Sequence, residues 1–95
     1  MTEENLQQNA LFMGLITMLS QGVMQHLGKI ADPLSGKVEK NIEAAKATID
    51  LILMLKNKTK GNLGPEEERF MSNVLTNLQL NYVEEMDSSK KESPN

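Results

Sequence analysis

Apolar and polar positions follow a helical period along most of this 95-residue chain. Projection at 100° per residue predicts three helices, over residues 3–27, 38–60 and 65–85. Gly28 is well placed to end the first helix, and Pro65 suits the first position of the third. Between the first two helices, Asp32-Pro33 and Ser35-Gly36 are turn signals. We therefore predict an all-α fold with one domain over residues 1–86.

The segment 55–70, LKNKTKGNLGPEEERF, joins the second and third helices through a turn of few residues. Gly61 supplies a left-handed residue that closes the second helix, and Leu63 can fold back onto an apolar residue of that helix. Thr59 can hydrogen-bond back into the helix, and Asn62 can bond the exposed backbone of the turn. So short a connection predicts that the two helices form an antiparallel hairpin.

The first helix is apolar around most of its circumference. Between residues 10 and 27, its polar strip spans about 80° and its apolar arc about 240°, whereas packing on one side needs about 100°. Leaving four or five large side chains in water forgoes roughly 1.5–3 kcal/mol each. We therefore predict a homodimeric helical bundle with this helix at the interface, rather than a monomer in which the helix is central and the connector covers it. The predicted interface residues are Leu11, Phe12, Leu15, Ile16, Leu19, Val23 and Leu27.

Composition excludes several classes of function. The chain has no cysteine, which removes disulfides and sulfur-ligated zinc. Its formal net charge of -3 and its scarcity of aromatic residues give no general attraction to nucleic acid or to an anionic membrane. The acidic start does not fit a signal peptide, and Gln21, Gln25 and His26 interrupt the long apolar run, so we expect a cytoplasmic protein without a membrane span. The tail, residues 87–95, has no apolar residue and is predicted to be disordered.

No catalytic or metal-binding constellation stands out in the sequence. The single histidine, His26, lies within the apolar arc without a Glu-x-x-His pair, which argues against a metal site and a histidine-based triad. Asp50 falls on the polar stripe of its helix four residues after Lys46, the spacing of an ordinary surface salt bridge. An enzyme would need His26, Asp50 and Lys58 to converge. We expect no catalytic residue and no cofactor.

Three lysines near the hairpin corner form the basic concentration of the chain: Lys56, Lys58 and Lys60. They support an alternative function, the binding of a ligand or a nucleic-acid phosphate beside the turn, aided by the amino end of the third helix. Cations at the carboxyl end of a helix already neutralise its dipole, and Glu66, Glu67 and Glu68 would repel a phosphate. The main prediction is therefore a non-enzymatic protein that acts through self-association and contact with a protein partner.

Several short motifs occur in an order similar to that of a known family. The matching residues include Phe12, Leu27-Gly28, Pro33, Gly36, Ile49-Asp50-Leu51, Leu55, Lys58-Thr59-Lys60-Gly61-Asn62-Leu63, Glu67 and residues 78–83. Over about residues 10 to 85, the chain resembles the small bacterial family catalogued as domain of unknown function 1844. The resemblance implies a bacterial, all-helical, cytoplasmic protein and implies no reaction. Family members typically carry Thr or Ser where this chain has Gly64, so the N-cap of the third helix is weaker here.

Overall fold

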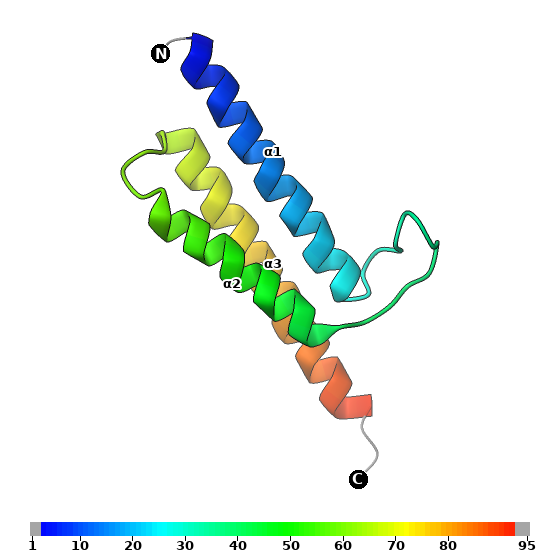
Figure 1. The fold of residues 1–95 in the computed structure, drawn as a ribbon. Helices are drawn as coiled ribbons and strands as arrows, with labels where there is room; N and C mark the ends of the chain where they lie inside the picture. Colours follow the sequence, from blue (N-terminus) through cyan, green and yellow to red (C-terminus); the bar gives the residue numbers. More distant parts are fainter. Residues whose placement is uncertain (1–2, 93–95) are drawn as a thin grey trace.

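In the computed structural model, which describes residues 3–92, three α-helices pack against one another (Figure 1). The helices are α1 (Glu3–His26), α2 (Ile42–Lys58) and α3 (Pro65–Glu92). Each helix contacts both of the others, and α3 returns alongside α2 after a short corner (Figure 1). No strand occurs in the range that the structure describes, so the prediction of an all-α fold is confirmed.

The core lies where the three helices meet. Its fully or almost fully buried apolar side chains are Ile16, Val23, Leu27, Ala45, Ile49, Ile52, Met71, Leu75 and Leu78. Along each segment these residues recur at helical spacing, so that one stripe faces inward. On α3, the partly buried side chains of Phe70, Val74 and Tyr82 pack against the same core. Each large buried side chain stabilises the fold by roughly 1.5–3 kcal/mol.

A left-handed glycine ends α1, as the sequence predicts. Gly28 has a φ of 76°, and its N–H donates to the Gln25 carbonyl at 3.0 Å. The N–H of Lys29 donates to the Met24 carbonyl at 2.9 Å. This pair of bonds is the Schellman motif, which satisfies carbonyl groups that the helix itself leaves unpaired. Thr2, which the sequence offers as the N-cap of this helix, lies outside the described residues.

The connector between α1 and α2 is a loop whose two ends are held together. The N–H of Asn41 donates to the His26 carbonyl at 2.7 Å, and Leu27 and Lys40 form an isolated antiparallel β-bridge. These contacts keep the residues before Asn41 extended. They therefore hold the start of α2 against the end of α1.

A compact turn forms the tip of the connector. The Asp32 carboxylate accepts hydrogen bonds from the N–H groups of Leu34 at 2.7 Å and Ser35 at 3.4 Å. The N–H of Gly36 donates to the Asp32 carbonyl at 2.8 Å, and Gly36 has a φ of 71°. The turn signals read from the sequence are thus confirmed. The turn presents Leu34 to solvent with 97% of its surface exposed.

The start of α2 differs from the predicted one. The helix begins at Ile42 rather than Val38, because the Asn41 side chain caps it and accepts a hydrogen bond from the Ala44 N–H at 3.0 Å. The connector holds the preceding residues extended, and this tertiary constraint outweighs the apolar character of Val38, which is exposed. The predicted start is therefore four residues too early.

The end of α3 also differs from the predicted one. The helix continues to Glu92 rather than ending near Glu85. No glycine or proline occurs between residues 66 and 92, so nothing in the backbone stops the helix where its apolar face ends. Residues 87–92, which the sequence placed in a disordered tail, are helical in the structure, and residues 93–95 lie outside the described range.

Salt bridges tie both ends of the connector to α3. Lys29 Nζ lies 3.1 Å from Glu85 Oε1 and 3.2 Å from Glu84 Oε1, and Lys40 Nζ lies 2.8 Å from Glu85 Oε2. The Glu85 side chain is largely buried. Hydrogen bonds from Lys40 and Lys29 hold the pKa of Glu85 below its ordinary value of 4.5. The carboxylate therefore remains charged in the folded protein across the neutral range.

We expect these contacts to make stability depend on pH in the acid range. Because the folded pKa of Glu85 is lowered, its contribution is present above the unfolded pKa and is lost as pH falls through the folded pKa. Glu85→Gln should lower the free energy of unfolding at neutral pH, and its difference from the wild type should shrink between about pH 5 and about pH 3. Denaturant titrations across this range provide the measurement. Glu84→Gln is the matched control, since Glu84 is exposed and, among the described side chains, forms an ion pair with Lys29. A Glu85→Gln difference independent of pH would contradict the assignment.

Candidate functional site

The corner between α2 and α3 is built from the residues of the KTKGNL motif. The helix ends at Lys58, two residues before the predicted end, with Thr59 as its C-cap, and the Thr59 hydroxyl donates to the Leu55 carbonyl at 2.7 Å. Gly61 has a φ of 89°, and the N–H of Asn62 donates to the Thr59 carbonyl at 2.8 Å. The roles predicted for Thr59 and Gly61 are therefore confirmed.

A buried glutamate completes the start of α3. The N–H of Glu68 donates to the Gly64 carbonyl at 3.0 Å, which makes Gly64 the N-cap and Pro65 the first helical residue. Glycine has no side chain with which to cap the helix. The Glu67 carboxylate lies over this position instead: a Cβ on Gly64 would be 3.1 Å from Glu67 Oε2, and Glu67 is 4% exposed. Glu67 thus holds the acidic third position of a capping box, next to the positive end of the helix dipole.

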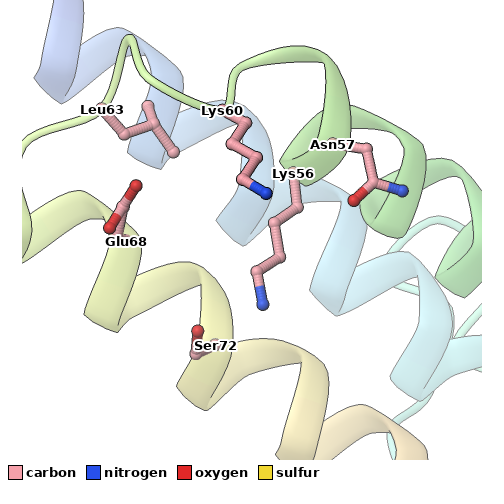
Figure 2. Close-up of a pocket in the computed structure, with 6 residues that line it drawn as sticks. All are labelled: Lys56, Asn57, Lys60, Leu63, Glu68 and Ser72. Carbon is pink, nitrogen blue, oxygen red and sulfur yellow. The ribbon is translucent and has the colours of Figure 1, made fainter.

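A cleft of about 440 Å³ opens beside the corner, between the end of α2 and the start of α3 (Figure 2). Its lining residues are Lys56, Asn57, Lys60, Leu63, Glu68 and Ser72. Figure 2 shows Lys56 and Lys60 extending into the space across from Glu68 and Ser72 on α3. Lys58 does not line the cleft. The structure therefore brings together two of the three lysines that the sequence indicated.

The two lysines leave the cleft with unused hydrogen-bond donors. Among the side chains that the structure describes, neither Lys56 nor Lys60 forms an ion pair. Each ammonium group therefore keeps its three donors for water or a ligand, and the Ser72 hydroxyl adds another. Glu68, on the opposite wall, lowers the attraction for an anion. The site can hold a small anionic group, with the glutamate as an opposing charge.

An exposed apolar stripe on α1 is the second candidate site. Leu11, Leu15 and Met18 are 75%, 42% and 64% exposed. Together with Gly22 they recur at spacings of four and three residues, which places all four on one face of the helix. We call these four residues the α1 stripe. Met18 is absent from the predicted interface, and the regular spacing of 11, 15, 18 and 22 is the signal that would have found it.

Three of the predicted interface residues face the core instead. Ile16, Val23 and Leu27 are fully buried within the chain itself. Phe12 and Leu19 are partly buried against the same core. Because α1 contacts both α2 and α3, the apolar arc on this side is already covered. These three side chains therefore pack inside the chain rather than on its surface.

The residues that an enzyme would need do not converge. The backbone of His26 lies beside Asn41 at the start of α2, whereas Lys58 is the last residue of that helix. Asp50 is exposed and forms the predicted salt bridge with Lys46, at 2.9 Å. The hydrogen bond from Lys46 to Asp50 raises the pKa of Lys46 above 10.5. Asp50 therefore has a structural partner on its own helix.

The described residues also offer no metal cluster and no helix that could cross a membrane. No cluster of three or more histidine, aspartate or glutamate residues within them is placed to hold a metal ion. None of their helices combines the length and the apolar character that crossing a bilayer requires.

Sequence reasoning missed Ser72 on the far wall of the cleft. Glu68 and Ser72 come from α3 and are four residues apart, as are Lys56 and Lys60. Such spacing places each pair on one helix face. One such pair at the end of a helix and another at the start of the next helix, joined by a short corner, are therefore a sequence signal for a shared cleft.

These features define a small all-α protein of three packed helices, with a polar cleft at the helical corner and an exposed apolar stripe on α1. The chain belongs to the family described as domain of unknown function 1844, whose profile matches residues 9–84. The matched range contains the KTKGNL corner, and it confirms the resemblance inferred from the sequence. Searches of curated proteins and of solved structures found no match to this chain.

The position of Glu67 predicts that it stabilises the start of α3. Glu67→Ala should lower the free energy of unfolding by about 1–2 kcal/mol, because it removes a buried carboxylate from the amino end of the helix. Glu66→Ala is the matched control: its side chain is exposed, and its effect should stay within about 0.5 kcal/mol. Urea denaturation followed by circular dichroism measures both variants. Equal losses in the free energy of unfolding for Glu67→Ala and Glu66→Ala would show that burial of Glu67 adds no stability.

Proposed function

We propose that this protein is non-enzymatic and acts through self-association and contact with other proteins. The observation that carries the proposal is the exposure of the α1 stripe. No charged residue occurs between Glu4 and Lys29, so a partner can cover this face without removing a charge from water. Exposed apolar patches on small proteins mark contact surfaces.

The size of the accessible surface supports self-association. The chain exposes 6754 Å², whereas a compact monomer of 10.6 kDa exposes about 5,500 Å². Its radius of gyration is 15.4 Å, against about 12.4 Å for a compact domain of this length. Part of the excess belongs to the end of α3, which projects past the other helices (Figure 1). The rest includes the exposed side chains of the α1 stripe, which a second copy can cover.

In the assembly that we propose, two copies form a helical bundle. Each copy contributes an antiparallel hairpin of α2 and α3, and α1 lies at the contact between copies. Leu34, Leu51 and Met54 are also exposed but belong to other segments, and they support contact with a different protein. A bacterial origin and a cytoplasmic location complete the proposal.

Changing the α1 stripe tests this proposal. Leu11→Glu should weaken self-association by about tenfold or more, because the contact would bury an unpaired charge. Sedimentation equilibrium at micromolar concentration measures the mass, and circular dichroism checks the helix content. Leu80→Glu is the matched control, since Leu80 is an exposed leucine on α3 and should leave the mass unchanged. A wild-type protein that sediments as a single 10.6 kDa species would overturn the proposal.

The cleft at the corner favours a second function, the binding of an anionic ligand or a nucleic-acid phosphate. Two unpaired ammonium groups and a hydroxyl share one cavity of about 440 Å³ beside the amino end of α3. Backbone N–H groups at a helix start favour anions. The opposing charge of Glu68 makes this function secondary to self-association.

Lys58 provides an internal control for the cleft. The double variant Lys56→Glu, Lys60→Glu should abolish binding of a labelled single-stranded RNA, whereas Lys58→Glu should reduce it far less, because Lys58 does not line the cavity. For neutral replacements by Gln, the slope of log affinity against log salt should fall by about one for each lysine that contacts a phosphate. Fluorescence anisotropy at two salt concentrations measures both effects. Equal losses for Lys58→Glu and the double variant would rule out the cleft as the binding site.

A further inference from the structure

The α1 stripe has the spacing of a coiled-coil seam. Leu11, Leu15, Met18 and Gly22 follow one another at steps of four, three and four residues. In a coiled coil, positions at these steps meet the same positions of a second helix and pack as knobs into holes. Gln8 lies three residues before Leu11, and Gln25 lies three residues after Gly22. Uncharged polar residues therefore flank the apolar part of the seam at both ends.

Gly22 is the one small residue in the seam, and none of the described residues of its own chain requires a glycine there. A Cβ at this position would meet no atom within 4 Å. A glycine inside a helix costs about 1 kcal/mol relative to alanine. Gly22 therefore leaves a gap on an exposed face, which a large side chain from outside the chain can fill.

Building on the self-association proposed above, we propose that two copies pair through α1 in antiparallel orientation, with Leu11 of each copy packed over Gly22 of the other. A two-fold axis between Leu15 and Met18 sets residue 11 opposite 22 and residue 15 opposite 18. Leu11 then meets Gly22 once at each end of the seam, and the two central pairs each join Leu15 to Met18. A parallel pair would set Gly22 against Gly22 and leave a cavity at one end of the seam.

Charges at the ends of α1 favour the same orientation. The first turn carries Glu3 and Glu4. In the antiparallel pair, the two acidic first turns lie at opposite ends of the seam and do not repel each other. Opposite ends of the two helix dipoles are neighbours as well. A parallel pair would place the acidic turns side by side.

Disulfide cross-linking tests the register, because the natural chain has no cysteine. Gln8→Cys and Gln25→Cys change uncharged polar residues at the ends of the seam and leave its apolar part intact. When the two full-length variants are mixed and oxidised, a disulfide-linked heterodimer should form at least tenfold faster than either variant links to itself. In the antiparallel pair, two copies of residue 8 lie about 25 Å apart along the axis, far beyond the ~7 Å between Cα atoms that a disulfide spans. Thr17→Cys, on an exposed polar face of α1, is the control and should not link to Gln8→Cys.

The outcomes separate the register from self-association itself. Rapid linkage of Gln8→Cys to itself would show a parallel pair and overturn the proposed register. A protein that sediments as a dimer but yields none of these links would show that another surface makes the contact. Neither of these two results would contradict self-association. A single 10.6 kDa species in sedimentation would overturn the register and the proposed function together.

Discussion

A helix can bury only the arc that its neighbours reach, and this limit shapes the whole molecule. α1 contacts both α2 and α3 and gives them the side that carries Ile16 and Val23. The two neighbours cannot also reach the face with Leu11 and Met18, which stays in water. The fold and the proposed assembly are therefore two results of one feature, an apolar arc wider than two partner helices can cover.

The polar cleft depends on the corner in a similar way. Thr59 and Gly61 end α2 within a few residues of the start of α3, so the last turn of one helix faces the first turns of the other. That proximity sets Lys56 across from Ser72 (Figure 2). A longer corner would separate the walls. The KTKGNL motif therefore has a structural task whether or not the cleft takes a ligand, which is why the cleft alone is a weaker functional signal than the α1 stripe.

Features that depend on neighbouring residues were predictable from the sequence, and features that depend on packing were not. Gly28 and Gly61 end helices through their own backbone conformation, so their roles could be read directly. The start of α2 depends on both kinds: Asn41 is a local N-cap signal, but its N–H bond to His26, which holds the preceding residues outside the helix, joins segments that meet only in the fold. Likewise, the width of the apolar arc was visible, but which part of it faces α2 and α3 is decided by packing. The interface prediction therefore included buried residues such as Ile16.

The closed base of the connector separates the tip of this loop from the three helices. Because the bond between Asn41 and His26 holds the loop ends together, doubling the length of the loop would cost only about 0.6 kcal/mol of additional closure entropy. Leu34, at the exposed tip, makes no contribution to the core. Substitutions and insertions at the tip can thus change what the protein presents to its surroundings while the bundle folds as before. The connector is the part of this scaffold where new specificity can arise at least expense to stability.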